Sequence, residues 1–219
     1  MKIKINYVIV IVLMMVLLGL QYHIKSNAYD FSGDELAQSL AISTVPLTLI
    51  TTEERCVNDL KEQTPCRQLQ NVQKGDILIT KSSFTLLYRH GHIALVVDAE
   101  QGLVIEALGY GTYSTLAELD KWNYYPTVQV LRLKDTNPEL QDQLTIHATE
   151  HYLDIPYSIL TTGTTTDRTH CSALIWKIFN DFGYDLNPRN SLVVRPQDFM
   201  ESPYLERIES YGFGLEQMW

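Results

Sequence analysis

Residues 168–179, RTHCSALIWKIF, have the pattern of an amphipathic helix that begins at a cysteine. Large apolar side chains recur at helical spacing from Leu174 to Phe182, and Gly183 follows as a C-terminal cap. Cys171 would then lie on the first turn, where unpaired backbone N–H groups and the helix dipole lower a thiol pKa. We expect Cys171 to be a nucleophile on a helix that packs against a sheet.

Short apolar runs upstream of this helix predict a small, mostly antiparallel sheet. Glycines separate these runs, as they do at turns between neighbouring strands, and the runs are Ile77–Thr80, His92–Val97, Leu103–Ala107 and Thr127–Leu133. Asn137 and Pro138 predict the cap and first residue of another helix, ending near Leu153. The expected fold class is α+β, a sheet with helices packed on one side.

The N-terminus has the pattern of an export signal. Lys2 and Lys4 precede an apolar run from residue 7 to residue 20, and small residues end at Ala28. Residues 1–28 are expected to be a cleaved signal peptide or, alternatively, an N-terminal anchor that tethers the chain to the membrane through residues 7–20. Both alternatives make the protein secreted or cell-surface, on the outer face of the cytoplasmic membrane if it is anchored.

The chain is acidic, with 17 Lys and Arg against 26 Asp and Glu and a formal net charge of −9. Residues 1–28 hold three lysines and no acid, so their removal leaves 17 less 3, or 14, basic side chains and a net charge of −12. This excess argues against nucleic acid, teichoic acid or anionic lipid headgroups as the main electrostatic partner.

Residues 29–73 are expected to form a helical lead-in, with the first helix near residues 34–40. Cys56 and Cys66 lie close together in this segment and are predicted to form a disulfide, because an exported chain meets oxidising conditions. The alternatives are two free thiols or a metal site, although the latter would need a second cysteine pair. Pairing these two cysteines leaves Cys171 as an odd thiol, which requires a reason.

His92 and Glu106 are the predicted partners of Cys171. They lie on consecutive predicted strands, and adjacent antiparallel strands bring side chains on one face within hydrogen-bonding distance. Apolar residues flank Glu106, where an unpaired carboxylate would be costly. Alone, such a cysteine is usually a small buried hydrophobe and such a histidine a turn residue. Together the three residues favour an activated nucleophile with an oriented base.

The order of motifs along the chain resembles the YiiX/YebB-like branch of the NlpC/P60 cysteine hydrolases. The motifs are KGDIL (74–78), RHGHIALVV (89–97), VIEA (104–107), PYS (156–158), HCSALIW (170–176) and RPQDF (195–199). The resemblance spans about residues 74–205. In that branch the papain-like core is circularly permuted, so that the histidine strand precedes the cysteine helix, as it does here.

The resemblance implies a permuted papain-like (NlpC/P60) catalytic domain over residues 74–219. It makes Cys171 the nucleophile, His92 the general base and Glu106 the residue that orients His92. Tyr157 and His170 would lie beside the substrate, with His170 standing where an aromatic residue is expected. The implied chemistry is hydrolysis of an amide or ester through an acyl-enzyme, with the backbone N–H of Cys171 as oxyanion donor and no metal or cofactor.

A competing interpretation comes from HATEH (147–151), which matches the His-x-x-Glu-His pattern of inverted zinc peptidases. Such enzymes need a further acidic ligand from another helix, and no later segment offers a well-placed one. Two partly exposed histidines on a helix are the simpler interpretation.

Two further alternatives keep the same fold. One is an acyltransferase resembling the lecithin:retinol acyltransferase group, and the other is a non-catalytic cell-surface binding domain. For a hydrolase, the expected partner is a small-molecule, peptide or lipid substrate at the cell envelope. A peptidoglycan stem peptide and an acyl or lipid-linked substrate both fit the sequence, which does not indicate an oligomeric state.

Overall fold

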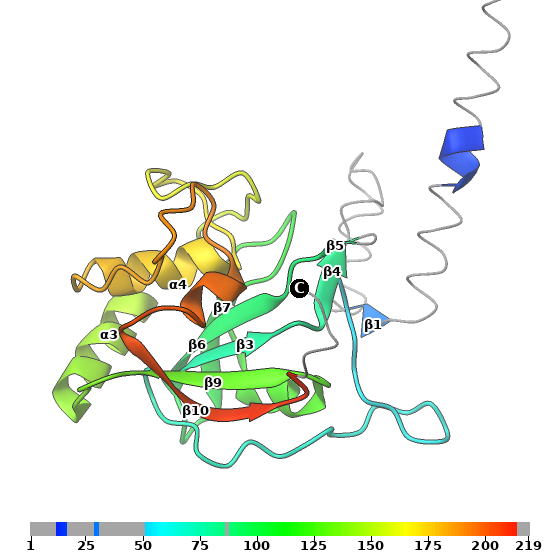
Figure 1. Cartoon of the computed structure of the whole chain (residues 1–219), viewed down its shortest axis with the longest axis horizontal. Coiled ribbons are helices and arrows are strands. Elements are labelled where there is room, and N and C mark those ends of the chain that lie inside the picture. The colour runs from blue at the N-terminus through cyan, green and yellow to red at the C-terminus, as the bar shows by residue number, and fades with distance from the viewer. Residues whose placement is uncertain (1–11, 17–28, 31–50, 86–87, 214–219) are drawn as a thin grey trace, which may run out of the picture.

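A computed structural model describes residues 12–16, 29–30, 51–85 and 88–213 of the chain (Figure 1). Most of the predicted export signal and the whole of the predicted helix at residues 34–40 lie outside the described residues. In the described part of the chain, no helix is both long enough and apolar enough to span a bilayer.

A fully antiparallel sheet forms the centre of the described molecule. Its strand order is β10-β9-β3-β6-β7-β8. The four predicted strands appear as β3 (Ile77–Thr80), β6 (His92–Asp98), β7 (Leu103–Ala107) and β9 (Val128–Leu133). Both edges, β8 (Ser114–Glu118) and β10 (Leu205–Tyr211), were missed by the sequence analysis. Each edge strand carries many exposed residues, so neither has the apolar run that marks a central strand.

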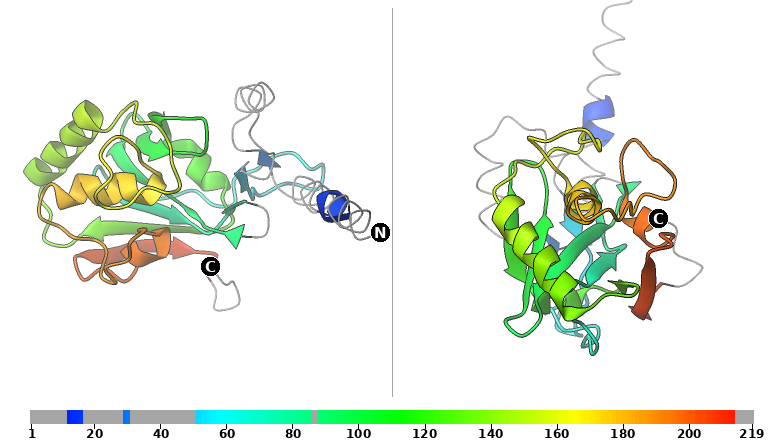
Figure 2. Two further views of the ribbon diagram at one scale, coloured as in Figure 1. Left: turned by 90° about the horizontal axis from the view of Figure 1, so that it is seen from above. Right: turned by 90° about the vertical axis from the view of Figure 1, so that its left-hand side faces the viewer.

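Helices cover one face of this sheet. The helix α3 (Pro138–His151) begins as predicted, because the Asn137 side chain accepts a hydrogen bond from the Leu140 N–H at 2.9 Å. The helix α4 (Cys171–Asn180) lies beside α3 on the same face, as Figures 1 and 2 show from several sides. The short helix α5 (Pro196–Phe199) follows. The main core lies between α3, α4 and the sheet, and its largest buried members include Ile77, Ile79, Ile93, Leu95, Leu174 and Phe179. This confirms the α+β class.

The opposite face of the sheet packs on a 3₁₀ helix, η2 (Leu119–Tyr124). Trp122 and Tyr125 are fully buried there against Val96, Val104 and Val130. The sheet is therefore a middle layer between α3 and α4 on one side and η2 on the other.

A second, smaller sheet joins the lead-in to the catalytic domain. Its order is β1-β2-β4-β5, built from β1 (Tyr29–Asp30), β2 (Thr52–Glu53), β4 (Ser83–Thr85) and β5 (Tyr88–Arg89). Residues 51–73, all of which the structure describes, contain no helix. The expectation of a helical lead-in is therefore wrong for this part, where hydrogen bonds to η2 and to β4 hold the chain in extended and turn conformations.

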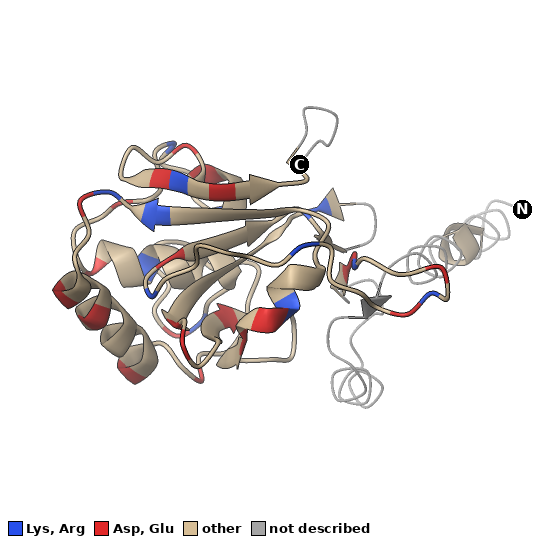
Figure 3. Cartoon of the chain, turned by 90° about the horizontal axis from the view of Figure 1, so that it is seen from below, with Lys and Arg blue, Asp and Glu red and all other residues tan. Residues whose placement is uncertain are grey.

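Positions of Lys and Arg and positions of Asp and Glu are both spread along the described chain (Figure 3). The exception is α3, whose acidic residues Glu139, Asp142 and Glu150 have no Lys or Arg beside them on the helix.

Candidate active site

Cys171 lies at the first position of α4, as the sequence pattern predicted. It is the free cysteine of the described residues and is 9 % exposed. The preceding residue, His170, is the N-cap, and its Nδ1 accepts a hydrogen bond from the Ala173 N–H at 3.3 Å. The thiol is thus held at a helix N-terminus, where the dipole favours its ionised form.

His92 and Glu106 lie together on the middle of the sheet. The strands β6 and β7 pair with Leu95 opposite Ile105, so the same register places Ala94 opposite Glu106 and His92 one diagonal step away on the same face. His92 Nε2 and Glu106 Oε2 are 2.8 Å apart, and both side chains are almost completely buried. The structure therefore brings these two residues together as the sequence analysis expected.

Lys121 and Trp122 complete the surroundings of this pair, and the sequence analysis missed both. Lys121 Nζ, on η2, donates a hydrogen bond to the other Glu106 oxygen, Oε1. The Trp122 ring stacks on the His92 ring with centroids 5.7 Å apart and an interplanar angle of 17°. A carboxylate with a cation on one oxygen and an imidazole on the other is held ionised and in a fixed orientation.

These contacts shift the pKa values of the two acid–base partners in opposite directions. Burial alone would raise the pKa of Glu106, but the charge of Lys121 and the hydrogen bond with His92 lower it to about 2. Burial would lower the pKa of His92, but hydrogen bonds with Cys171 and Glu106 raise it to about 9. Glu106 is therefore ionised and His92 protonated at neutral pH.

The pKa of the Cys171 thiol is lowered. Burial alone would raise it, but hydrogen bonds with His170 and His92, together with the positive charge of His92, lower it well below its ordinary value. Since Nε2 of His92 faces Glu106, Nδ1 is the ring nitrogen that faces the sulfur. The resting site is a thiolate–imidazolium pair, the form in which a cysteine attacks a carbonyl.

A cleft of about 290 Å³ opens over Cys171. The two other predicted site residues, Tyr157 and His170, both line it. The Tyr157 backbone is held beside Thr169 by a parallel bridge, which carries its ring to the start of α4. Burial and the negative charge of Cys171 raise the pKa of Tyr157, so its hydroxyl stays protonated.

The sequence analysis did not anticipate the other walls of the cleft. They come from the segments before β6 and α5 and from the loop after Tyr157, and include Tyr88, His90, Ile159, Val193, Val194, Arg195 and Pro196. Of these segments, RHGHIALVV and RPQDF were noted as motifs, but only the fold shows that their first residues face Cys171.

Cys56 and Cys66 form a disulfide, with their Cα atoms 5.4 Å apart. The loop that they close is attached to η2, because the two cysteine N–H groups donate to two η2 carbonyls at 2.9 and 2.8 Å. Arg55, which precedes the loop, donates from Nη1 to the Lys121 carbonyl at 2.6 Å. The disulfide loop therefore contacts the element that carries Lys121 and Trp122.

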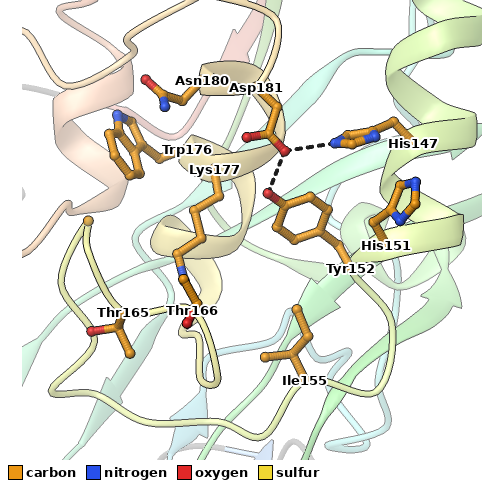
Figure 4. Close-up of a pocket in the computed structure, with 11 residues that line it drawn as sticks. His147, His151, Tyr152, Ile155, Thr165, Thr166, Trp176, Lys177, Asn180 and Asp181 are labelled. Atoms are coloured by element: carbon orange, nitrogen blue, oxygen red, sulfur yellow. Dashed lines mark hydrogen bonds and ion pairs between the residues drawn. The ribbon is translucent and has the colours of Figure 1, made fainter.

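The HATEH histidines lie at a separate cavity of about 410 Å³ on the outer side of α4 (Figure 4). His147 Nε2 lies 2.7 Å from Asp181 Oδ2, and the Tyr152 hydroxyl donates to the same oxygen at 2.7 Å. The sequence analysis expected no later acid to approach these histidines, and Asp181 does, because the C-terminus of α4 meets that of α3. Among the described residues, no group of three or more His, Cys, Asp or Glu could hold a metal ion. Three of the side chains that line the cavity, His147, Tyr152 and Asp181, bond to one another.

The chain matches a known protein family. The model of a family described as permuted papain-like amidase enzymes, YaeF/YiiX, the C92 family, matches residues 71–209. Among solved structures, the crystal structure of the metalloprotein YiiX from Escherichia coli O157:H7 is similar, at 20 % identity over 63 % of this chain and 96 % of that chain, with a TM-score of 0.49. Curated proteins gave no significant match. Because the family model covers more than half of the chain, this protein belongs to the permuted papain-like amidases of the YaeF/YiiX family and is a cysteine hydrolase.

Proposed function

We propose that the protein is an exported hydrolase that cleaves an amide through an acyl-enzyme on Cys171. The sulfur attacks the carbonyl carbon, and the π electrons of the carbonyl move to its oxygen. When the tetrahedral intermediate collapses, the carbon–nitrogen bond breaks and His92 gives its proton to the departing amine. Water then attacks the thioester while His92 takes a proton from it, and the carbon–sulfur bond breaks to release the acid and the thiolate.

The placement of Cys171 at the start of α4, next to His92 and its partner Glu106, is the observation that carries this mechanism. Cys171 and His92 come from different elements, α4 and β6, and each shifts the pKa of the other toward the charged form. A structural cysteine in a core has no need of a protonated imidazole held by a carboxylate and a lysine. The pair supports turnover over the alternative of a non-catalytic binding domain.

The wall of the cleft supports an apolar acyl group as the part of the substrate that binds beside Cys171. Ile159 and Val193 line the cleft and are 57 % and 38 % exposed, and their sequence neighbours Leu160 and Leu192 are 82 % and 75 % exposed. Apolar side chains this exposed gather at ligand grooves more often than on inert surface. The cleft favours an acyl or lipid-linked amide.

A peptidoglycan stem peptide fits this wall less well. Its carboxylates and amines would need charged partners, and among the described residues that line the cleft there is no Asp or Glu. Arg195 is the lining residue with a permanent charge, and its guanidinium already lies 3.3 Å from Asp198.

The experiment that tests this function uses the purified chain with acetyl, octanoyl and palmitoyl amides of a fluorogenic aminocoumarin, and with a muramyl stem peptide. We expect release of the aminocoumarin, faster for the longer acyl groups, and an acid-quenched protein whose mass at Cys171 is increased by one acyl group. Cys171→Ala is the matched control and should show neither. Cleavage of the stem peptide alone would overturn the substrate class. An adduct transferred to an added alcohol or amine in preference to water would indicate the acyltransferase alternative.

The location outside the cytoplasm rests on the N-terminal sequence pattern and on the disulfide, which forms in oxidising compartments. Fractionation of cells that produce the protein tests it. The expected result is activity in the periplasmic, secreted or surface fraction, with a protein that begins at residue 29 if the signal is cleaved.

A further inference from the structure

The ring of His170 caps α4 through Nδ1 and also interacts with the adjacent Cys171 sulfur. Its Nδ1 accepts from the Ala173 N–H at 3.3 Å, which requires that Nδ1 carry no proton. The ring proton therefore resides on Nε2. The helix cap therefore makes Nδ1 of His170 the acceptor and Nε2 the donor.

This donor is buried and makes no full hydrogen bond within the described part of the chain. His170 is 5 % exposed, its Nε2 is inaccessible to solvent, and the group that its ring acts on is the adjacent Cys171 sulfur. Leaving a buried N–H unsatisfied costs about 1–3 kcal/mol, so such groups are rare and concentrate where a ligand completes them. The group lies in the wall of the cleft over Cys171, next to the reacting sulfur.

The position of this N–H matches the movement of charge in the reaction. In the resting enzyme the negative charge lies on the Cys171 sulfur, and in the tetrahedral intermediate it lies on the carbonyl oxygen. The sulfur lies at the start of α4, and the oxygen of the carbonyl that it attacks would lie close to the first-turn backbone N–H groups, which have no partner within the helix. A donor near the sulfur, fixed in tautomer by its own helix cap, is already oriented for that oxygen.

We propose that the Nε2–H of His170 is an oxyanion donor, which acts with the backbone N–H of Cys171 on the oxygen of the tetrahedral intermediate. This inference rests on the proposed acyl-enzyme mechanism and adds a catalytic residue to it. It assigns the two histidines different roles: His92 transfers protons, while His170 donates a hydrogen bond from Nε2.

The test uses two variants that separate capping from donation. His170→Asn keeps a good N-cap acceptor on a shorter side chain, so that it preserves the start of α4 but removes the Nε2–H from the cleft. His170→Phe removes both functions. Matching thermal unfolding of wild type and His170→Asn would show that the helix start is intact.

Two rates are measured for each protein from about pH 6 to about pH 9.5: turnover of the octanoyl amide, and alkylation of Cys171 by iodoacetamide. Alkylation reports the thiolate and forms no oxyanion. We expect His170→Asn to lower the ratio of turnover to alkylation by roughly 100-fold to 1000-fold at every pH. If the ratio returns to the wild-type value at high pH, where the thiol of each protein is ionised, His170 only holds the thiolate and the proposal is wrong.

A carbonyl compound that binds Cys171 but is not hydrolysed tests the oxyanion role of His170 separately from the proposed hydrolase function. The Cys171 sulfur adds to the carbonyl carbon of octanal, and the octanal oxygen takes up a proton. The product is a hemithioacetal, which has no leaving group. Weaker binding of octanal to His170→Asn, with unchanged alkylation at high pH, supports the oxyanion role, and equal binding contradicts it. If the wild-type chain turns over no amide at all, the proposed function fails before any His170 variant is made.

Discussion

The nucleophile side and the histidine side of the cleft are built in different ways. The nucleophile side, His170 and Cys171, belongs to consecutive residues at the start of one helix. The histidine side joins His92 on β6, Glu106 on β7 and Lys121 on η2, three elements that meet only when the sheet has formed. The first side follows from local helix rules, whereas the second depends on tertiary packing. Changes on the nucleophile side should therefore affect chemistry, and changes on the histidine side should affect both chemistry and stability.

The largest effect is expected from Cys171→Ala. Loss of the sulfur removes the covalent step, so kcat/KM for the octanoyl amide should fall by about 10⁴-fold to 10⁶-fold. The unfolding free energy should change by only about 1 kcal/mol, because the buried site loses a single small group. Kinetics and urea unfolding of the same preparation check both numbers. Retention of a tenth of the activity would contradict the thiol mechanism.

His92→Ala should lower kcat/KM by roughly 10²-fold to 10⁴-fold, the usual contribution of a general acid–base. Without the imidazolium, the pKa of the Cys171 thiol should rise toward about 8.5, the value of an ordinary thiol. The pH dependence of Cys171 alkylation, followed by mass spectrometry, measures this shift. Wild type should react fast well below that pH, and an identical pH profile for the variant would show that the two residues are not coupled.

Turnover should also decline at high pH in the wild-type enzyme. The pKa of His92 is raised to about 9, so the imidazolium and its stabilising contacts are fully present below its unfolded pKa of about 6.5 and are lost as the pH rises through about 9. Both kcat and the unfolding free energy should therefore fall in that range. A pH profile that is flat through pH 9 would contradict a protonated His92.

Lys121→Met tests the histidine side through its stability. Removal of one partner of a buried charge pair costs about 3–5 kcal/mol at neutral pH. The Glu106 pKa is depressed to about 2, so its contribution is present above its unfolded pKa of about 4.3 and is lost as the pH falls through about 2. The difference between variant and wild type in urea unfolding should shrink over that acid range.

The control for this variant is Lys74→Met, which breaks an ion pair with Asp142 that is largely exposed. It should leave stability and turnover almost unchanged, because solvent screens such pairs. Equal effects of the two lysine variants would remove the distinction between the two sides of the cleft.

The smallest effect on turnover is expected from the double variant Cys56→Ser and Cys66→Ser. The bridge closes a short loop and should contribute about 2–3 kcal/mol to the unfolding free energy. Turnover should fall a few-fold through the looser attachment of η2, while the alkylation rate of Cys171 changes less. Unchanged turnover at a temperature well below unfolding would show that the loop does not position Lys121.

The sequence predicted the features that depend on neighbouring residues, such as helix starts, and the strands that contain strong apolar runs. The start of α4 at Cys171, the cap at Asn137 and the hairpin that joins His92 to Glu106 all follow from spacing and turn chemistry. Lys121 could not be found in this way, because it lies on a 3₁₀ helix with no clear pattern and meets Glu106 only when η2 packs on the face of the sheet that carries Glu106. The edge strands β8 and β10 were missed for a related reason, since neither contains a continuous buried apolar run and their pairing is determined by the neighbours.

The disulfide loop makes the attachment of η2 depend on the redox conditions of the compartment. Thiols stay reduced in the cytoplasm, so a newly made chain there would lack the Cys56–Cys66 bridge and hold η2 less firmly. In an oxidising compartment the bridge can form, and η2, which carries Lys121 and Trp122, is then held more firmly. If the chain is exported as we propose, formation of the bridge would coincide with arrival at the site of action and would raise turnover a few-fold.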